Sequence, residues 1–361
     1  MLAVLLSLVM ATTPLWDHPG YDAEDSHHNP GETVITSGKI RHVVTKWQVS
    51  LRTSGSSCSG FSDPVLSGGR VYVSDQLGIS AYTAATGAVA WRYDWDDPGD
   101  SETPRLAVSD GLLIVAGGDC NSQSDPDGQL IALDAGTGLP RWKQRVDIPV
   151  YAAVVDKSVL VVSGGSPSDE DAIMAYHVRD GRPAWQKTGY RAGGVSANGT
   201  ILARATDGTD VSAAVEITTG TVRWTRKAAW TAEAASPASD RFLVTGAGGV
   251  LSSVRVSDGQ LEWSASTFPS SEAIAVDRAR VYRVAGRDVE ALNVADGKRA
   301  WTARQKADGV QPVTAAGLIY AGAAVLNASD GKVAGPDVAG RVIVAGGRIH
   351  QVVSGQLRTL G

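Results

Sequence analysis

The residues best suited to chemistry include two acidic stretches. The first stretch places five carboxylates within nine positions, at Asp94, Asp96, Asp97, Asp100 and Glu102. Carboxylate oxygens clustered in this way can coordinate a hard cation such as calcium. The second stretch, 119–128, is similar to a calcium loop but lacks the alternation of ligands and the bidentate glutamate of such loops. We interpret the first as a solvated loop and the second as a long hairpin loop held by Cys120, and we expect no metal in either.

A third group of reactive side chains lies near the N-terminus. It consists of His18, Asp22, Asp25, His27 and His28. Histidines and carboxylates bind metals and carry protons. Their spacing fits neither a helix nor a strand, so we expect no element to bring them together. We therefore interpret this segment as a polar arm without a metal site.

Sequence signatures of catalysis are absent. The chain has no Gly-Xaa-Ser-Xaa-Gly elbow, no His-Glu-Xaa-Xaa-His motif and no glycine-rich phosphate loop in front of a helix. Its 361 residues carry a net charge of −5, with 20% charged and 43% hydrophobic residues and no dense run of Lys or Arg. This composition indicates a globular protein and argues against nucleic acid or an anionic membrane as a partner.

The elements that must position any site form an internal repeat. In six segments a glycine precedes a tryptophan by four residues, in the pairs Gly87–Trp91, Gly138–Trp142, Gly181–Trp185, Gly220–Trp224, Gly259–Trp263 and Gly297–Trp301. Successive tryptophans lie 51, 43, 39, 39 and 38 residues apart. A period near forty is typical of propellers and solenoids.

Each repeat reads as four short strands. In the first, 69–74 and 78–82 alternate apolar and polar residues, a Thr-Gly turn follows at Gly87, and another strand carries Trp91. The fourth strand comes from the stretch after each tryptophan, such as 62–67 or 311–315. Four antiparallel strands per forty residues make one blade of a propeller.

The ends of the chain set the number of blades. Unit seven has Gly335 where a tryptophan should stand, and unit eight stops before its fourth strand. The segment 40–47 is an outer strand with Trp47 but no preceding unit. We therefore predict an all-β, eight-bladed propeller of four-stranded antiparallel blades, whose ring closes when the N-terminal strand around Trp47 completes the C-terminal blade.

The repeated tryptophans have a structural interpretation. We expect each indole to pack on the neighbouring blade, at Trp47, Trp91, Trp142, Trp185, Trp224, Trp263 and Trp301. Trp16, Trp95 and Trp230 lie outside the pattern and are free for another role.

Candidate ligand residues follow from the architecture. The innermost strand of each blade borders the central tunnel, and the side chains at its N-terminal end line one mouth. In this register they are polar and differ between blades: Asp63, Arg105, Tyr151, Glu233, Glu272 and Gln311. Such a mixture suits a specific small ligand or acid–base chemistry, and a water-filled funnel is the alternative.

The N-terminus and the cysteines bear on the compartment. Residues 1–15 form a signal-like apolar segment, although a basic start is missing, with a buried segment as the alternative. Cys58 and Cys120 form one disulfide if the chain is exported, or remain unpaired thiols in a cytosolic protein. We therefore expect an arm at 16–39 and a single propeller domain at 40–361, secreted or extracytoplasmic and without a transmembrane anchor.

The strands, the Ala-Xaa-Thr-Gly turn and the tryptophan four residues on resemble the quinoprotein-type repeat. Relatives include the alcohol dehydrogenases that use pyrroloquinoline quinone (PQQ) and the lipoprotein scaffold of the outer-membrane protein assembly machine. The dehydrogenases imply a disulfide between adjacent cysteines and a calcium site of Glu, Asn and Asp, neither of which maps onto this chain. The scaffold implies a lipid-modified cysteine after the signal, yet no cysteine precedes Cys58.

Three classes of function follow. The first is an exported, non-catalytic and monomeric scaffold that binds a protein or carbohydrate partner. The second is an enzyme or small-ligand propeller that uses the polar funnel. The third is a PQQ-dependent oxidoreductase. We favour the first and expect no cofactor, neither the quinone nor calcium.

Overall fold

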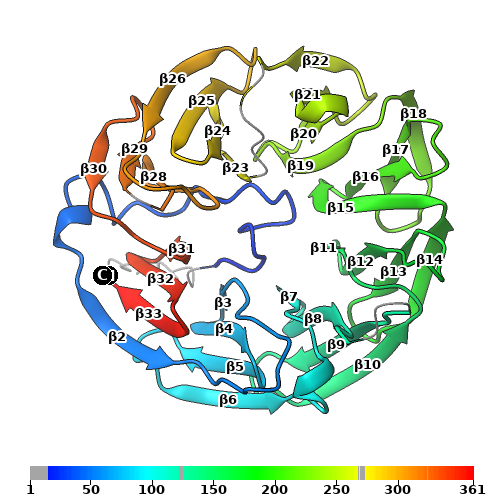
Figure 1. Ribbon diagram of the computed structural model, residues 1–361, viewed down its shortest axis with the longest axis horizontal. Helices are drawn as coiled ribbons and strands as arrows, with labels where there is room; N and C mark the ends of the chain where they lie inside the picture. The colour runs from blue at the N-terminus through cyan, green and yellow to red at the C-terminus, as the bar shows by residue number, and fades with distance from the viewer. Residues whose placement is uncertain (1–14, 122–124, 267, 269–272, 323) are drawn as a thin grey trace, which may run out of the picture.

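A ring of eight blades surrounds a central channel in the computed structural model (Figure 1). The structure describes residues 15–361 apart from 122–124, 267, 269–272 and 323. Each blade is a four-stranded antiparallel sheet, as the sequence predicted, and one blade gains a short fifth strand. The signal-like segment expected at 1–15 lies outside the described residues except for Leu15.

In blades 1 to 4 the four strands follow one another in chain order, from the innermost strand at the channel to the outermost strand at the rim. Blade 1 contains β3 (Val65–Ser67), β4 (Arg70–Asp75), β5 (Gly78–Thr83) and β6 (Val89–Asp94). Blade 2 contains β7 (Arg105–Ser109), β8 (Leu112–Gly118), β9 (Gly128–Asp134) and β10 (Pro140–Val146). Blade 3 contains β11 (Ala152–Asp156), β12 (Val159–Gly164), β13 (Ala172–His177) and β14 (Pro183–Thr188). Blade 4 contains β15 (Tyr190–Ala197), β16 (Thr200–Ala205), β17 (Val211–Glu216) and β18 (Val222–Lys227).

The other four blades complete the ring. Blade 5 contains β19 (Thr231–Ala235), β20 (Arg241–Thr245), β21 (Leu251–Arg255) and β22 (Leu261–Ser264). Blade 6 contains β23 (Ala273–Val276), β24 (Arg280–Ala285), β25 (Asp288–Asn293) and β26 (Arg299–Arg304). Blade 7 contains β27 (Val313–Ala315), β28 (Leu318–Tyr320), β29 (Val325–Asn327) and β30 (Val333–Gly335), with β1 (His28–Asn29) beside β27. Blade 8 contains β31 (Arg341–Ala345), β32 (Arg348–Val353), β33 (Gln356–Leu360) and β2 (Thr45–Ser50).

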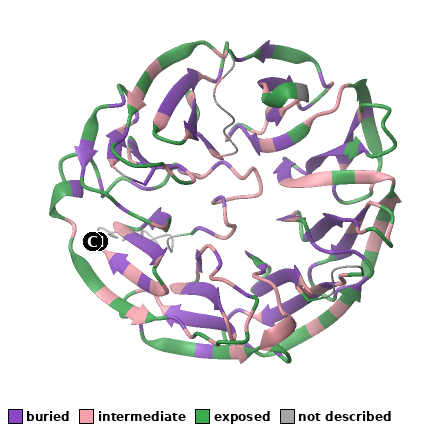
Figure 2. Cartoon of the chain, viewed as in Figure 1, coloured by how far each residue is buried: buried purple, intermediate pink, exposed green. Residues whose placement is uncertain are grey.

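Burial follows the position of a strand within its blade. Strands in the middle of a blade, such as β5, are buried along almost their whole length, whereas outer strands such as β6 alternate exposed and less exposed residues (Figure 2). Middle strands pack between two neighbouring blades and are therefore apolar on both faces. Besides strands, the described chain contains three short 3-10 turns: η1 (Ile40–His42), η2 (Pro98–Asp100) and η3 (Ala247–Gly249). None of its helical turns is long and apolar enough to cross a membrane.

The repeated tryptophans connect each blade to the next. In seven blade junctions the indole N–H donates to a backbone carbonyl of the following blade at 2.7–3.0 Å. The ring lies on the turn glycine of that blade, where an added Cβ would come within 2.5–2.8 Å of it. These glycines also have φ near +70°, as Gly138 does at +75°. The turn therefore needs glycine for its backbone as well as for the indole.

The ring closes through the N-terminal strand. β2 pairs antiparallel with β33, with Trp47 opposite Thr359, and so becomes the outer strand of blade 8. In blade 7 Gly335 occupies the tryptophan position, and the fully buried Ile40 packs on it. Ile40 thus fills the space next to Gly335 in the junction that lacks a tryptophan.

The arm that precedes this strand crosses the centre of the ring (Figure 1). Residues 16–29, which we call the channel arm, hydrogen-bond to the innermost strand of all eight blades at 2.7–2.8 Å. From blade 1 to blade 8 the arm residues are Trp16, Asp17, His18, Ala23, Glu24, Ser26, His27 and Asn29, and their partners are Leu66, Val108, Val155, Ser196, Ala235, Val276, Thr314 and Val344.

Six of these partners lie in the C-terminal half of their innermost strand, and Leu66 and Thr314 are the middle residues of three-residue strands. The channel arm therefore occupies that end of the channel. Trp16, which the sequence left free for another role, is fully buried, and its backbone N–H and C=O both pair with Leu66.

Candidate functional site: a polar cavity above the channel arm

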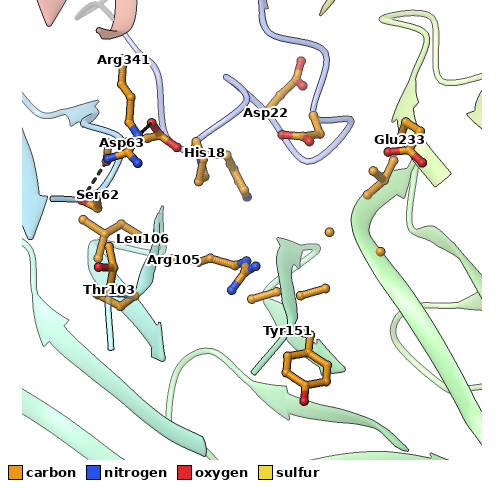
Figure 3. A pocket seen from close by; sticks show the side chains of 18 of the residues that line it. His18, Asp22, Ser62, Asp63, Thr103, Arg105, Leu106, Tyr151, Glu233 and Arg341 are labelled. Carbon is orange, nitrogen blue, oxygen red and sulfur yellow. Dashed lines mark hydrogen bonds and ion pairs between the residues drawn. The ribbon is translucent and has the colours of Figure 1, made fainter. Parts of the chain in front are cut away.

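The open end of the channel holds a polar cavity. It divides into two adjoining parts of about 550 and 590 Å³, and both are bordered by Pro19, Asp25, Phe61, Asp63 and Arg341. The channel arm supplies one side of each part, and the N-terminal ends of the innermost strands supply the walls. Figure 3 shows the first part, with His18 and Asp22 of the arm beside Arg105, Tyr151 and Glu233 of the blades. This volume is in the range of pockets that bind small molecules.

Five of the six funnel residues predicted from the sequence border this cavity. Asp63, Arg105, Tyr151 and Glu233 line the first part, and Gln311 lines the second. Glu272 lies outside the described residues. The register of the innermost strands thus places these five side chains at one cavity.

Three of these side chains connect neighbouring blades. Arg105 donates to the carbonyl of Val150 at 3.0 Å, which links blade 2 to the start of blade 3. Gln311 donates to the carbonyl of Ile274 at 2.7 Å, between blades 7 and 6. Asp63, before blade 1, forms an ion pair of 3.1 Å with Arg341 of blade 8. These residues therefore stabilise the wall in addition to lining it.

The remaining two side chains are placed differently. Glu233 accepts a hydrogen bond from Thr245 in its own blade. Tyr151 is 52% exposed, and its ring lies 5.6 Å from the guanidinium of Arg191. It is the one aromatic side chain among the strongly exposed hydrophobic residues that the structure describes. Tyrosine and arginine at an accessible rim are typical of protein interfaces.

The carboxyl groups of the cavity have raised pKa values. Burial, followed by the charge of Glu24, raises the pKa of Asp22 to about 7 from its usual 3.8. Burial also raises the pKa of Asp25 and Asp63, against the opposing charges of His27 and Arg341. A carboxyl group whose pKa is near 7 is partly protonated at neutral pH and can give up or accept a proton, as acid–base catalysts do.

The channel arm brings together residues that were expected to remain apart. His18, Asp22 and Asp25 border the first part of the cavity, and His27 borders the second. The expectation was wrong because helix or strand periodicity is not what aligns them. Hydrogen bonds to eight successive blades do so, six from the arm backbone and two from the side chains of His18 and Asn29, and an irregular segment shows no periodic signal for that arrangement. The only sign of this arrangement in the sequence was the length of the arm, which exceeds that of a short connection.

The two acidic stretches lie on blades 1 and 2. Asp96 forms an ion pair with Lys143 at 3.0 Å, and Asp97 caps η2 by accepting from Gly99 at 2.8 Å. The stretch 119–128 joins β8 to β9 and is held by a disulfide between Cys120 and Cys58, whose Cα atoms are 6.5 Å apart. Within the described residues no group of three or more His, Cys, Asp or Glu is placed to hold a metal.

The residues present do not fit the quinone site of the dehydrogenases. The only two cysteines are 62 positions apart and join two loops, so they are not the adjacent pair that the resemblance implies. The carboxylates Asp22, Asp25 and Asp63 lie in the cavity among two arginines, Arg105 and Arg341. The positive charge of Arg105 acts on Asp25 and Asp63, and Arg341 forms an ion pair with Asp63, so these guanidinium groups oppose the binding of a divalent cation at the two carboxylates.

Comparisons with known proteins agree with this architecture. A family model described as "Outer membrane protein assembly factor BamB" matches residues 44–119, 78–209 and 207–346. The outer membrane protein assembly factor BamB of Burkholderia pseudomallei is 29% identical over 176 residues. That match covers 45% of this chain and 44% of the relative, so the chain spans less than half of the curated relative it matches.

Solved structures share the fold at low identity. The crystal structure of BamB from Moraxella catarrhalis has a TM-score of 0.64 and 18% identity, over 88% of this chain and 97% of that one. The quinohemoprotein alcohol dehydrogenase from Comamonas testosteroni has a TM-score of 0.70 and 13% identity, over 98% and 81%. At such identities the likeness concerns the fold alone.

Proposed function

Since the chain belongs to the family of the outer membrane protein assembly factor BamB, we propose that it is an exported, non-catalytic propeller that binds a partner protein at the open mouth of its central cavity. The description of that family names an assembly factor, and this supports a scaffold role within a protein assembly for the present chain. Carbohydrate is the alternative partner.

The observation that carries this proposal is that three of the polar side chains lining the cavity are bonded to neighbouring blades. Arg105, Gln311 and Asp63 are bonded to neighbouring blades. A catalytic group must be able to bond to substrate, so residues that stabilise a wall favour a rigid platform over a reaction centre. The channel arm occupies the other end of the channel, and this leaves the mouth and its rim for a partner.

Export is supported by the disulfide between Cys58 and Cys120 and by the apolar start of the sequence. Disulfides persist mainly in oxidising compartments. The proposed function requires no quinone and no metal.

A photo-crosslinking experiment tests the proposal. A benzophenone amino acid replaces Tyr151, which is 52% exposed beside the cavity, in the full chain expressed in its own source. We expect a discrete crosslinked species that contains a second protein.

The matched control places the same probe at Val89, which is 47% exposed on the outer strand of blade 1. The proposal predicts no crosslink there. Equal crosslinking at both positions, or none at Tyr151 while the protein is folded and exported, contradicts a partner site at the mouth.

A small-molecule or enzymatic role of the cavity is the second candidate. The observation that favours it is the Asp22 carboxyl group, whose pKa near 7 results chiefly from burial. Under this alternative the purified protein retains a small molecule or turns over a substrate, Asp22→Asn abolishes that binding or turnover, and no second protein crosslinks at position 151. The scaffold proposal predicts instead that Asp22→Asn leaves the crosslink intact and that no ligand accompanies the purified protein.

A further inference from the structure

The ring of His18 is hydrogen-bonded at both of its nitrogens. Nδ1 lies 2.7 Å from a carboxylate oxygen of Asp17, and Nε2 lies 2.7 Å from the carbonyl oxygen of Val155 in β11. Both partners only accept hydrogen bonds, so each ring nitrogen must carry a proton. Both hydrogen bonds can therefore form together only when His18 is the imidazolium cation.

The surroundings of His18 favour this cation. Asp17, Asp22, Glu24 and Asp25 of the channel arm are the carboxylates that interact with it. Among the described blade residues, Arg105 at the start of β7 borders both hollows next to His18, and Asp63, Tyr151, Glu233 and Arg341 are the other ionisable groups of the cavity that His18 borders. The remaining residues that line the smaller hollow beside His18 are apolar except for the arm residue Pro19: Leu106, Ala107, Ile114, Ala116, Ala153, Val154, Val155 and Leu160. Burial lowers the pKa of His18, but the hydrogen bond and charge of Asp17, the Val155 carbonyl and Asp22 together raise it.

We propose that the channel arm is an acid-tightened plug, in which protonated His18 joins the arm to blade 3 and loss of its proton loosens residues 16–29 from the channel. A neutral imidazole has one N–H and can keep only one of the two bonds. The other acceptor then stays without its donor in a largely buried site, which favours the released arm. Release also removes Pro19, Asp22 and Asp25 from the border of the cavity.

The direction of the pH dependence follows from linkage. Because the docked state raises the pKa of His18, its contribution is fully present below the usual histidine value of 6.5 and is lost as pH rises through the raised pKa. Burial raises the pKa of Asp22, Glu24 and Asp25 as well, so their protonation also favours docking as pH falls. His28 opposes them, since burial lowers its pKa.

Hydrogen–deuterium exchange of the full chain between pH 6 and 9, corrected for the intrinsic rate, tests the plug. The protection factor of peptides from 16–29 is expected to fall with rising pH. If docking raises the His18 pKa by one, the total fall is up to about tenfold. Strands of the blades are expected to keep constant protection. His18→Gln, which can donate to Val155 but cannot titrate, is expected to remove the histidine part of this dependence above pH 6.5.

His42→Gln is the matched control, because His42 is exposed in η1 and lies outside the channel arm. It is expected to behave as the wild type. Neutron diffraction of the wild type at pH 6 gives a second readout that needs no variant, with deuterium expected on both His18 nitrogens. A singly protonated His18 at that pH, or equal slopes above pH 6.5 for the wild type and His18→Gln, overturns the proposal.

Discussion

Ile40 packs directly on Gly335, at the place in blade 7 where the seven other blades carry a tryptophan. A Cβ on Gly335 would lie 2.8 Å from two side-chain carbons of Ile40, which is itself fully buried. Arg41 strengthens the contact by donating to the carbonyl of Ala334 at 2.8 Å. The segment that leads into the closing strand thus also supplies packing at the junction of blades 7 and 8.

Replacement of Ile40 by alanine is expected to destabilise the ring. Truncating a buried isoleucine costs about 2–5 kcal/mol, because the contacts are lost and a cavity remains. Urea unfolding measures the loss. Val44→Ala is the control, since Val44 is 57% exposed and its truncation is expected to change the unfolding free energy by less than about 0.5 kcal/mol. Equal effects of the two substitutions contradict the role of Ile40 in closure.

Trp91 offers a test of the contacts between blades. Its indole is 8% exposed, donates to the carbonyl of Ala135 at 3.0 Å and lies on Gly138. Trp91→Ala is expected to cost about 3–5 kcal/mol, as for other large buried side chains. Arg92→Ala, at an exposed position of the same strand, is the matched control. A cost below about 1 kcal/mol for Trp91→Ala refutes the structural role of the repeated indoles.

Loss of the disulfide is expected to lower stability without changing the fold. The bond joins Cys58 to Cys120 across 62 positions and so restricts a long loop of the unfolded chain. Removing such a bond typically costs about 2–4 kcal/mol. The melting temperature of the double variant Cys58→Ser and Cys120→Ser is the readout, and circular dichroism should keep its β-sheet signature. An unchanged melting temperature under non-reducing conditions contradicts this expectation.

The Asp22 carboxyl group is expected to make stability depend on pH. Burial, then the charge of Glu24, raises its pKa to about 7 from 3.8, so the folded protein holds a proton that the unfolded chain releases. Stability linked to this group therefore falls as pH rises from about 4 to 7. Asp22→Asn, which imitates the neutral acid, is expected to flatten the melting temperature between pH 5 and 7.

Asp134→Asn is the control for that titration. The hydrogen bond from Arg141 lowers the pKa of Asp134 to about 2, so this carboxylate stays ionised across the window. Its substitution should leave the pH slope unchanged. A slope that Asp22→Asn fails to reduce shows that other groups cause it.

The propeller could be predicted from the sequence because each blade repeats one local pattern. The spacing from Gly138 to Trp142 recurs in other units, and the unmatched Trp47 strand indicated how the ring closes. Both signals arise from local turns and strand alternation, which a sequence displays directly.

The channel arm could not be predicted in the same way. Its residues bond to eight strands that are far apart in the chain, from Leu66 to Val344, and it has no periodicity of its own. The register of the strands placed five of the six funnel residues at the cavity, but it did not predict the hydrogen bonds that they form. That Arg105 reaches Val150 depends on the angle between blades, which no local pattern encodes.

Native mass spectrometry of the protein purified from its own source, under non-reducing conditions, tests the non-catalytic binding role most directly. We expect the mass of the bare chain less two hydrogens, for the bond between Cys58 and Cys120, with any additional mass due to a partner protein. A small molecule that is retained in the native protein and released on denaturation contradicts the non-catalytic binding role, because it identifies the cavity above the channel arm as a ligand or cofactor site.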